Sequence, residues 1–448
     1  MGKLNSRQQT FLKQEFGDRV TFSPIERKLY AHDIAALPGL IKPLVGDAFP
    51  EAVVQPQTEQ ELVELVHWAN EHNIPLTPRG KATSGYGGVI PVKGGIVVDF
   101  HHMRRVVSLD TAVMTVTAQA GMVWEKLDRE LAQKGFTLRL YPSSYPAATV
   151  GGWLAQGGAG IGSYEFGWFR DNVVSARVVL PDGNVKTFTK SELDLISEAE
   201  GITGFITEVT LHIQPHEELE LMSISCPDAH NMQKLARAII EHKIPVWSFL
   251  FINPRMAELK NKAPLMEHYG EPAEERVLLP VAYIVTLAYR KKDSEAVKGK
   301  LPGLLKSCPA QLLSDEIARH EWNNRFKLMI VKRLGPSLVP AEVVVPLSHL
   351  GDVMSEIETK IKQPVVKEGV VIRQGANGEP EVVILGFIPS DQRKFSYNLV
   401  FPLTLTIMKI AEKYGGRPYA TGLYFSKKGN KVLGASRVAQ LRAFKEKL

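Results

Sequence analysis

The chain has 448 residues, 44% of them hydrophobic and 23% charged, which is ordinary for a globular protein of two or three domains. Its net charge of +6 comes from 54 Lys and Arg against 48 Asp and Glu, a mild excess that suits an anionic ligand or partner surface. The two cysteines, Cys226 and Cys308, lack CxxC spacing, which excludes an iron–sulfur cluster or a structural zinc site and predicts two buried free thiols and no metal.

The N-terminal part of the chain predicts helices and then a βαβ unit. Residues 1–45 predict a helical lead-in, and residues 52–54 predict a short apolar strand. Thr58 is the expected N-cap of the next helix, with Glu61 three residues on. The apolar residues that follow recur at helical spacing: Leu62, Leu65, Val66 and Ala69.

A glycine-rich loop follows the next strand, which is predicted at residues 74–76. Gly80 and Gly85 have the spacing of a nucleotide-triphosphate P-loop. That motif needs Lys and then Ser or Thr at the next two positions, where this chain has Tyr86 and Gly87. ATP or GTP hydrolysis is therefore disfavoured, and further strands are expected at 95–99 and 114–118.

A second glycine-rich stretch runs from residue 142 to 167, before a strand predicted at 173–180. Glycine permits positive φ angles that align successive N–H groups into an anion nest, and two such loops suit a pyrophosphate held from both sides. Ordinary surface turns are the alternative. Neither stretch contains an intact G-x-G-x-x-G, which disfavours a Rossmann dinucleotide site.

A third segment, residues 201–208, leads into a strand predicted at 209–213, after which the composition of the sequence changes. Beyond Pro215 glycine becomes sparser, and apolar strands such as 343–345 and 382–385 alternate with amphipathic helices. We therefore place a domain boundary near residue 217.

Seven segments share the order and spacing of one protein family. They are PQTEQEL at 56–62, PRG at 78–80 with its loop to 88, VVD at 97–99, QAG at 119–121, TVGG at 149–152, GWFRDNV at 167–173 and GITGFITE at 201–208. Together they resemble the FAD-linked oxidases of the vanillyl-alcohol oxidase type, whose fold is also named after p-cresol methylhydroxylase (PCMH).

The resemblance implies an α+β protein with a PCMH-type, two-part FAD-binding domain and an α+β cap domain that binds the substrate. The implied division is a helical N-terminal lead-in at 1–45, the FAD-binding domain at 46–217, the cap domain at 218–400, and a C-terminal segment at 401–448 that returns to the flavin domain.

FAD is the cofactor that the resemblance implies. The segment 80–84 would lie at the pyrophosphate, with 149–152 on its other side. Asp171 and Asn172 would lie near the flavin, and Ile202 and Ile206 near the adenine or ribose. The implied cofactor-binding residues are Pro78, Arg79, Gly80, Lys81, Ala82, Thr83, Ser84, Gly85, Pro142, Ser143, Thr149, Gly151, Gly152, Gly158, Gly162, Asp171, Asn172, Val173, Gly201, Ile202 and Ile206.

The flavin is expected to be bound non-covalently. The family often attaches it to a histidine in a pattern like Arg-x-Gly-Gly-His-Ser. Here the string runs from Arg79 to Ser84, and Thr83 stands at the attachment position. The second loop contains no cysteine that could serve instead.

The likeness over the whole length is nearest to the glycolate oxidase and D-lactate dehydrogenase branch. Trp322-x-x-Arg325 resembles a motif of that branch whose arginine pairs with a substrate carboxylate, and a bidentate guanidinium suits a planar carboxylate. A surface arginine on a helix is the alternative.

The branch also has histidine motifs expected near 385–393 and after Gly416, and this chain has no histidine at either place. Since such a histidine normally supplies the general base for carbinol oxidation, the base is left unassigned.

The segment 415–418, Gly-Gly-Arg-Pro, is similar instead to a string of the aldonolactone and alditol oxidases, with Tyr419 where those enzymes have histidine. The phenol of Tyr419 could serve the flavin site, or the ring could be a core aromatic. The candidate catalytic residues are Arg325, Arg417 and Tyr419.

The resemblance implies an FAD-dependent dehydrogenase that oxidises a small hydroxy acid such as D-lactate or glycolate and passes electrons to a protein or quinone acceptor. Two alternatives stay open: a polyol or aldonolactone oxidase, and a flavoprotein subunit that relays electrons in a larger redox complex. The chain lacks cluster ligands, so an iron–sulfur acceptor would be a separate partner.

The sequence also predicts where the protein resides. The first 30 residues hold no apolar stretch suited to a signal peptide, and the apolar run at 277–289 is too short to cross a bilayer. The densest basic stretch, 290–300, lacks aromatic residues and predicts a solvated helix face rather than a nucleic-acid site. We expect a cytoplasmic protein without a transmembrane segment, and a peripheral place on a membrane redox complex stays open.

Overall fold

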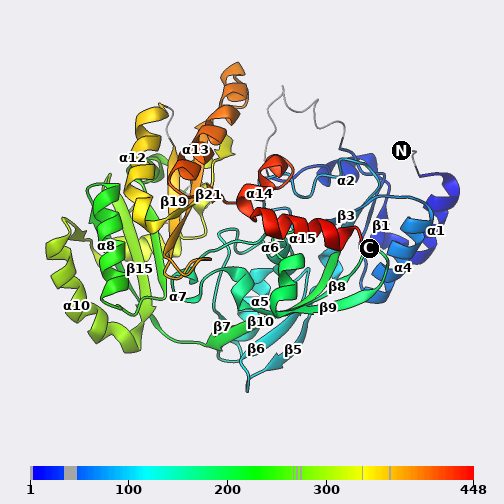
Figure 1. The fold of residues 1–448 in the computed structure, drawn as a ribbon, viewed down its shortest axis with the longest axis horizontal. Helices are drawn as coiled ribbons and strands as arrows, with labels where there is room; N and C mark the ends of the chain where they lie inside the picture. The colour runs from blue at the N-terminus through cyan, green and yellow to red at the C-terminus, as the bar shows by residue number, and fades with distance from the viewer. Residues whose placement is uncertain are drawn as a thin grey trace. The chain divides into compact units, whose positions relative to one another are not determined.

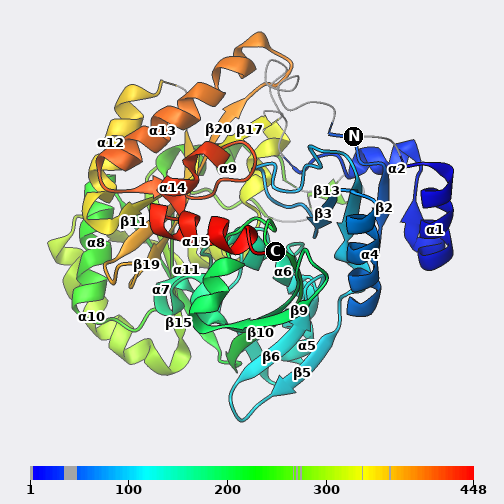
Figure 2. The same cartoon turned by 45° about the vertical axis from the view of Figure 1, so that its right-hand side comes forward.

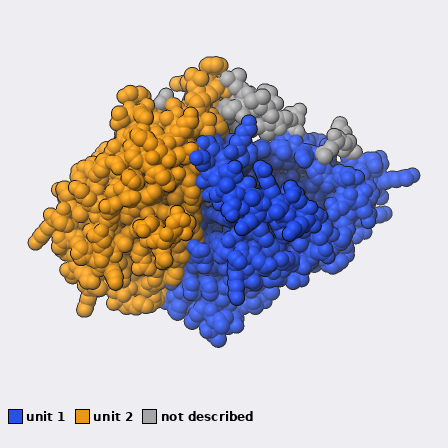
Figure 3. Space-filling view, in the orientation of Figure 1, with its two compact units in different colours: residues 1–158, 169–216, 420–448 blue, residues 159–168, 217–419 orange. Residues whose placement is uncertain are grey.

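The computed structural model describes residues 4–34, 48–265, 267–268, 271–272, 275–334, 337–362 and 365–448 (Figure 1). The chain forms two compact units (Figure 3). Unit 1 consists of residues 1–158, 169–216 and 420–448, and unit 2 consists of residues 159–168 and 217–419. Both units combine sheets with helices, which confirms the α+β class.

The first sheet of unit 1 has the strand order β1-β2-β4-β3, in which β2, β4 and β3 are parallel. The helix between β2 and β3 is α4 (Glu59–Glu71), which begins where the Thr58 side chain accepts a hydrogen bond from the backbone N–H of Glu61. Its predicted apolar face is buried, as expected. The strands are β1 (Val20–Thr21), β2 (Ala52–Val54), β3 (Leu76–Arg79) and β4 (Ile96–Asp99).

The N-terminal lead-in contains more than helices. Helices α1 (Ser6–Phe16) and α2 (Pro24–Leu29) were expected, whereas β1 between them was not. Strand β1 pairs antiparallel with β2, with Val20 opposite Val54, and so satisfies backbone groups that β2 would otherwise present at a sheet edge. The predicted end of the lead-in near Pro43 lies outside the described residues.

The second sheet of unit 1 is built around one long strand, β10 (Phe205–Pro215). It extends beyond the predicted 209–213 because it pairs with β6, β7 and β8 along its whole length. The sheet order is β5-β6-β10-β8-β9, with β7 also on β10. The other strands are β5 (Val106–Asp110), β6 (Thr115–Gln119), β7 (Phe136–Leu138), β8 (Val173–Val179) and β9 (Val185–Thr189).

Short helices connect and cover the strands of unit 1 (Figure 2). They are α5 (Trp124–Ala132), α6 (Val150–Gln156), α14 (Gly429–Val432) and α15 (Ala435–Lys445). The C-terminal α15 is anchored by the Arg437 guanidinium, which lies 2.6 Å from the Glu198 carboxylate. Phe444 packs edge-on against Phe188 of β9.

Unit 2 is organised by one antiparallel sheet in the order β16-β11-β15-β12-β19-β20-β18-β21, with β17 also paired to β20. The strands are β11 (Leu219–Cys226), β12 (Ser248–Ile252), β15 (Tyr283–Arg290), β16 (Gln311–Leu312), β17 (Ser337–Pro340), β18 (Val343–Pro346), β19 (Val366–Ile372), β20 (Glu381–Ser390) and β21 (Arg417–Pro418). A separate two-stranded ribbon is formed by β13 (Glu267–His268) and β14 (Glu271–Pro272).

The helices of unit 2 pack on this sheet and on one another. Helix α8 contacts α10 and α12, whereas α7 and α9 contact β19. The helices are α7 (Ser163–Phe166), α8 (Ala229–Glu241), α9 (Pro254–Lys262), α10 (Ser294–Ser307), α11 (Asp315–Asn323), α12 (Leu350–Lys360) and α13 (Phe401–Lys413).

The division into units falls at residue 216/217, close to the boundary expected from the sequence. At the C-terminal end, residues 401–419 belong to unit 2, although the sequence assigned them to a segment returning to the flavin domain. The reason is that α13 buries Ile407, Met408 and Ala411 and packs against α12 and β18. The stretch 159–168 also belongs to unit 2, which the sequence did not indicate.

Both cysteines are buried and free, as predicted. In the part of the chain that the structure describes, no helix has the length and apolar character needed to span a membrane.

Two glycine substitutions test this packing. A Cβ at Gly121 would lie 1.9 Å from the Phe100 carbonyl oxygen, so Gly121→Ala should lower the free energy of unfolding by about 1–3 kcal/mol or more. Gly303 lies exposed in α10 with no atom within 4 Å of a Cβ, so Gly303→Ala should raise it by about 0.5–1 kcal/mol. Urea unfolding measures both, and equal stability of the two variants would contradict this packing.

Candidate functional site

The first glycine loop leaves the end of β3 in unit 1. Arg79, the last residue of β3, is fixed because its guanidinium donates to the backbone carbonyls of Leu29, Tyr30 and His32. Ala82 then adopts φ 52°, in the left-handed region that non-glycine residues seldom occupy. A single left-handed residue among ordinary ones turns successive N–H groups toward one side, which is the geometry of an anion nest.

The glycine loop forms one wall of the site, and the start of α6 forms the second wall, which lies close to the loop. Thr149 caps α6, because its hydroxyl accepts from the backbone N–H of Gly152 at 3.2 Å. A Cβ at Gly80 would lie 2.4 Å from that hydroxyl, and a Cβ at Gly152 would lie 2.7 Å from it. A Cβ at Gly151 would meet the Ala120 Cβ at 2.5 Å. Glycine is therefore required on both walls for them to come this near.

A cavity of about 120 Å³ lies between these walls. Segment 78–84, the start of α6 and segment 200–206 contribute most of its lining. Of the residues predicted to bind the cofactor, the structure brings twelve together around it: Pro78, Arg79, Gly80, Lys81, Ala82, Thr83, Ser84, Thr149, Gly151, Gly152, Gly201 and Ile206.

The remaining predicted cofactor-binding residues do not line this cavity. Ile202 is half exposed at the end of a tight turn, and Asp171 is exposed as well. Asn172 and Val173 are buried where the chain enters β8. The others are Gly85, Pro142, Ser143, Gly158 and Gly162; the last lies in unit 2.

Glu200 is a cavity residue that sequence reasoning missed. Its carboxylate accepts a hydrogen bond from the Gly422 backbone N–H at 3.0 Å, and its other oxygen faces Gly88. Burial, together with the negative charges of Glu198 and Asp33, raises the pKa of Glu200 to about 7, although the bond from Gly422 opposes this. Glu200 adopts a positive φ of 53°, and no pattern in the sequence predicts that conformation or singles out this residue.

The hydrogen bond to Glu200 is part of a C-terminal strap formed by residues 420–426. Tyr424 donates its backbone N–H to the Tyr86 carbonyl at 3.2 Å, and Phe425 packs edge-on against the Tyr86 ring. Gly422 can lie against Tyr86 because it has no Cβ, which would come within 2.3 Å of the Tyr86 oxygen. The strap therefore braces the loop that follows the cavity wall.

These features fit FAD. The loop and the start of α6 offer backbone N–H groups, glycine surfaces and the ammonium of Lys81 to a diphosphate. The Lys81 ammonium lies 3.0 Å from His101 Nδ1, and burial and this cation lower the pKa of His101, so the imidazole is neutral there at pH 7.

Two of the candidate catalytic residues cluster in unit 2. The Arg417 guanidinium lies over the Trp168 ring, 4.9 Å from its centre, and the Tyr419 ring stacks on Trp168 at 6.4 Å. The Tyr419 hydroxyl accepts from the backbone N–H of Ala159 at 3.2 Å. Burial raises the pKa of Glu381, and the positive charge of Arg417 partly offsets this.

Arg325, the third candidate, lines a different cavity in unit 2. Its guanidinium lies over the rings of Trp322 and Phe326, at 4.2 and 4.6 Å, and donates to the Trp322 carbonyl. This cavity is small, about 20 Å³, which is room for one water molecule. We call it the Arg325 cavity; its polar and charged lining residues are Lys260, Thr286, Glu321, Asn324, Arg325, Lys327 and Glu368.

The structure therefore does not bring the three candidates into one cavity. Arg417 lines a separate groove of about 600 Å³, and Tyr419 packs against an apolar cluster of unit 2. The other ionisable residues of this cavity were not found from the sequence, because Lys260 and Glu368 are far from Arg325 in the chain and Glu321, four residues before it, lies in no recognisable motif.

A buried ion pair lies in the Arg325 cavity. The Lys260 ammonium donates to both carboxylate oxygens of Glu321 at 2.7 Å. The two side chains are only 11% and 6% exposed, so each charge depends on the other for compensation.

Comparison with known proteins supports the cofactor. Residues 50–189 match the family model of the FAD binding domain. A mitochondrial D-lactate dehydrogenase [cytochrome] of Arabidopsis thaliana is 28% identical over 326 residues, covering 70% of this chain and 56% of that protein. A glycolate oxidase subunit of Bacillus subtilis is 26% identical, covering 69% of this chain and 68% of that protein. The chain thus spans little more than half the length of the first of these relatives.

A solved structure shares the fold. p-Cresol methylhydroxylase with its substrate bound superposes with a TM-score of 0.77 at 13% sequence identity, covering 99% of this chain and 95% of that one. This confirms the PCMH-type fold that the sequence motifs implied.

Removing the charge of Glu200 should change how FAD affinity depends on pH. The pKa of Glu200 is above the ordinary carboxyl value, so the group is neutral at pH 6 and ionised at pH 8, where it repels a diphosphate. Wild-type affinity should fall about fivefold across this range if FAD raises that pKa by one unit. Glu200→Gln should bind FAD equally at both values. Fluorescence titration of flavin-free protein measures this, with the exposed Glu192→Gln as control; parallel pH profiles for all three proteins would contradict the assignment.

Breaking the buried ion pair should cost stability. Lys260→Met leaves the Glu321 carboxylate buried without its cation, which costs about 3–5 kcal/mol. Adding Glu321→Leu should restore most of that loss, because no uncompensated charge remains. Urea unfolding measures both, and a single variant as stable as the wild type would show that the pair is not enclosed.

The cradle of two glycine-rich walls, the matching family model and the shared fold agree with one another. The chain carries an FAD binding domain at residues 50–189 and shares the fold of p-cresol methylhydroxylase.

Proposed function

We propose that the chain is an FAD-dependent dehydrogenase that oxidises a small 2-hydroxy acid and passes the electrons to a protein or quinone acceptor. The observation that carries the proposal is the guanidinium of Arg325, which is held in a fixed orientation among other ionisable groups; the small cavity that it lines must widen to admit the acid. The relatives named as D-lactate dehydrogenase and glycolate oxidase subunit support the same substrate class.

Arg325 suits a carboxylate because its orientation is fixed. Two aromatic rings and the Trp322 carbonyl hold the guanidinium plane, so little side-chain freedom remains to be lost when an anion binds. A planar carboxylate can accept two parallel N–H donors from such a plane.

The charge of the cavity also favours an anion. Its lining holds three cations, Lys260, Arg325 and Lys327, against the carboxyl groups of Glu321 and Glu368. One positive charge is left over when both carboxyl groups are ionised, and two are left over when one is protonated. An acid is attracted to this lining more strongly than a neutral polyol is.

FAD would supply the hydride-accepting chemistry of such an oxidation, and the protein would supply orientation and charge. Pro78 to Ser84 and Thr149 to Gly152 would hold its diphosphate, and Thr83 in the first loop offers no nucleophile for a flavin link of the histidine type. We infer that the flavin is released by acid precipitation of the protein.

An electron-relay subunit is the second candidate, since the histidines of the hydroxy-acid branch are missing. Such a subunit has no need for an arginine lining a cavity of ionisable groups. The same experiment separates the two functions, because a relay subunit is not reduced by a small hydroxy acid.

Anaerobic reduction of the flavin tests the proposal. D-Lactate or glycolate should bleach the flavin absorbance of the wild-type protein, whereas xylitol and gulonolactone should not. Arg325→Ala should weaken binding of the acid about 10- to 100-fold, since a charged hydrogen-bond partner is lost, and Arg325→Lys should recover part of it.

The matched control is Arg319→Ala, which removes an exposed arginine from the preceding helix α11 and should leave the acid affinity unchanged. A flavin that no hydroxy acid reduces would contradict the proposed function. A flavin reduced equally well by wild type and Arg325→Ala would contradict the role of Arg325.

A further inference from the structure

We propose that the C-terminal strap acts as a clasp for the cofactor: it holds the two walls of the cradle together while FAD is bound, and FAD exchanges when the strap detaches. The strap, residues 420–426, lies in unit 1 together with both walls. The proposal concerns retention of FAD and holds whichever substrate the protein oxidises.

The strap contacts the loop wall at Tyr86. The backbone N–H of Tyr424 donates to the Tyr86 carbonyl at 3.2 Å, and the rings of Phe425 and Tyr86 meet edge-on with their centres 6.0 Å apart. Gly422 lies so near that a Cβ on it would come within 2.3 Å of the same carbonyl oxygen. Tyr86 stands two residues before Gly88, which lines the FAD cavity, so this contact fixes the loop where it forms the wall.

The strap contacts the second wall through Glu200. The Gly422 backbone N–H donates to the Glu200 carboxylate at 3.0 Å. The backbone N–H of Glu200 donates in turn to the carbonyl of Ala155 in α6 at 2.8 Å, and both of these residues line the cavity. One strap residue, Gly422, therefore lies against the Tyr86 carbonyl of the loop and is bonded to Glu200, and so joins the two walls.

The loop and the segment that carries Glu200 also lie close to each other beside the strap. A Cβ at Gly88 would lie 2.8 Å from the second carboxylate oxygen of Glu200, and a Cβ at Gly201 would lie 2.8 Å from Cγ of Pro78. The spacing of the cavity lining at this point therefore depends on where the strap holds Glu200.

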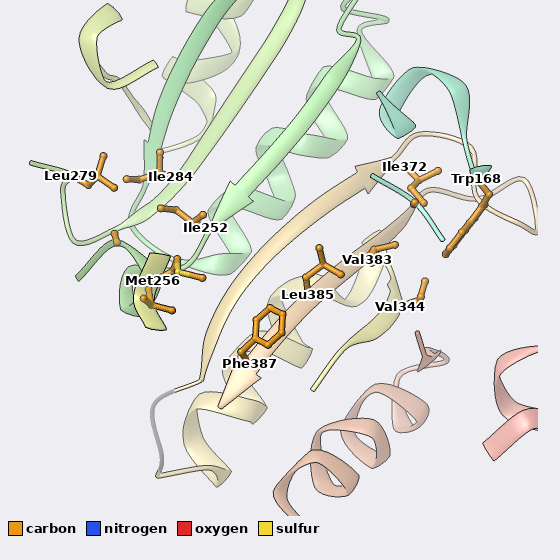
Figure 4. Packing of buried hydrophobic residues seen from close by; sticks show 13 residues of the cluster. Trp168, Ile252, Met256, Leu279, Ile284, Val344, Ile372, Val383, Leu385 and Phe387 are labelled. Atoms are coloured by element: carbon orange, nitrogen blue, oxygen red, sulfur yellow. The ribbon is translucent and has the colours of Figure 1, made fainter. Parts of the chain in front are cut away.

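The chain is anchored before and after the strap. Tyr419, the residue before it, packs against the apolar cluster of unit 2 that Figure 4 shows. After the strap, Arg437 of α15 donates to the Glu198 carboxylate at 2.6 Å. Its guanidinium also donates to the carbonyls of Ser197 and Asp194, at 2.7 and 3.1 Å. The strap can therefore detach and return to the same place while the chain on either side of it stays fixed.

The strap has little regular structure of its own. Residues 422–425 form a turn rather than a helix or a strand. Segments that lack a regular hydrogen-bond ladder open locally at low cost, without unfolding of the domain. Opening of the strap releases Tyr86 on one wall and Glu200 on the other at the same time.

Opening of the strap and binding of FAD are thermodynamically linked. Walls that are already held at the right spacing lose less freedom when a ligand binds, so the closed form should bind FAD more tightly than the open form. A ligand that prefers the closed form stabilises that form by the same factor, because such coupling is reciprocal. FAD should therefore protect the strap against opening, and a loosened strap should release FAD faster.

Hydrogen exchange of the FAD-loaded and the flavin-free protein, followed by mass spectrometry, tests this linkage without any turnover. FAD should slow exchange of the strap amides, including those of Gly422 and Tyr424, by about 10-fold. Helix α12 of unit 2 is the internal control, and its exchange should not change. A strap that exchanges equally fast with and without FAD would overturn the proposal.

Gly422→Ala loosens the strap and leaves the cavity lining unchanged. The new Cβ would overlap the Tyr86 carbonyl, so FAD should dissociate about 10- to 100-fold faster, because the hydrogen bonds to both walls are weakened. Gly135→Ala is the matched control. Gly135 also has a positive φ, 80° against 49° for Gly422, but it is exposed and has no atom within 4 Å of a Cβ, so its variant should release FAD at the wild-type rate. Flavin fluorescence after dilution of the loaded protein gives the rate.

Arg437→Met tests the same device from the anchor of α15, away from the cavity. It removes the three contacts that this side chain makes with the segment 194–198, so the strap should detach more often and FAD release should be about 3- to 10-fold faster. Arg437→Lys keeps a cation beside Glu198 and should recover part of the retention.

The outcomes separate the strap from the cradle. If the wild type binds FAD and Gly422→Ala releases it at the wild-type rate, the clasp is overturned and the cradle stands. If the wild type does not bind FAD, both are overturned. If Gly422→Ala does not fold, the Arg437→Met rate and the wild-type exchange measurement decide, and an unchanged result in both overturns the proposal.

Discussion

The cofactor site depends on one close approach, between the backbone at Gly80 and the hydroxyl of Thr149. Any side chain at Gly80 would overlap that hydroxyl, since its Cβ would lie 2.4 Å away. The same hydroxyl caps α6, so it fixes the start of the helix and the spacing of the two walls together. Gly151 and Gly152, in the second wall, likewise have no room for a Cβ. The strap holds the cavity from the C-terminal side of the chain, because the Gly422 backbone N–H donates to Glu200. A diphosphate site made of backbone groups follows from these contacts, because backbone donors need a surface without side chains.

Unit 2 presents a different physical situation, in which charged groups occupy an apolar sheet face. The ion pair of Lys260 and Glu321 is nearly closed to water, and Glu368 lies directly opposite Ile252 and Leu385 in the strand register. Buried charges are costly to keep, so their presence in a core is more readily explained by chemistry than by stability. Two aromatic rings hold the Arg325 guanidinium in a fixed orientation, so these charged residues include one cation that is oriented to bind an anion.

The sequence predicted local elements well where their signals are local. Thr58 and Glu61 marked the start of α4, and the glycine spacing marked both walls of the cradle. It did not predict β1, because a two-residue strand is formed by its pairing with β2 rather than by its own composition. It placed Ile202 near the cofactor, whereas a tight turn leaves that side chain half exposed. Glu200 and Glu368 could not be found, since their environments come from residues distant in the chain. Their raised pKa values arise from burial, which no single-sequence pattern encodes.

The central claim is that the backbone cradle of unit 1 recognises the diphosphate of FAD. The most direct test is titration of flavin-free protein with FAD, FMN and riboflavin in parallel, followed by flavin fluorescence. The account predicts one FAD per chain and much weaker binding of FMN and riboflavin, which lack the diphosphate. Equal affinity for the three flavins, or no binding of FAD, would contradict it.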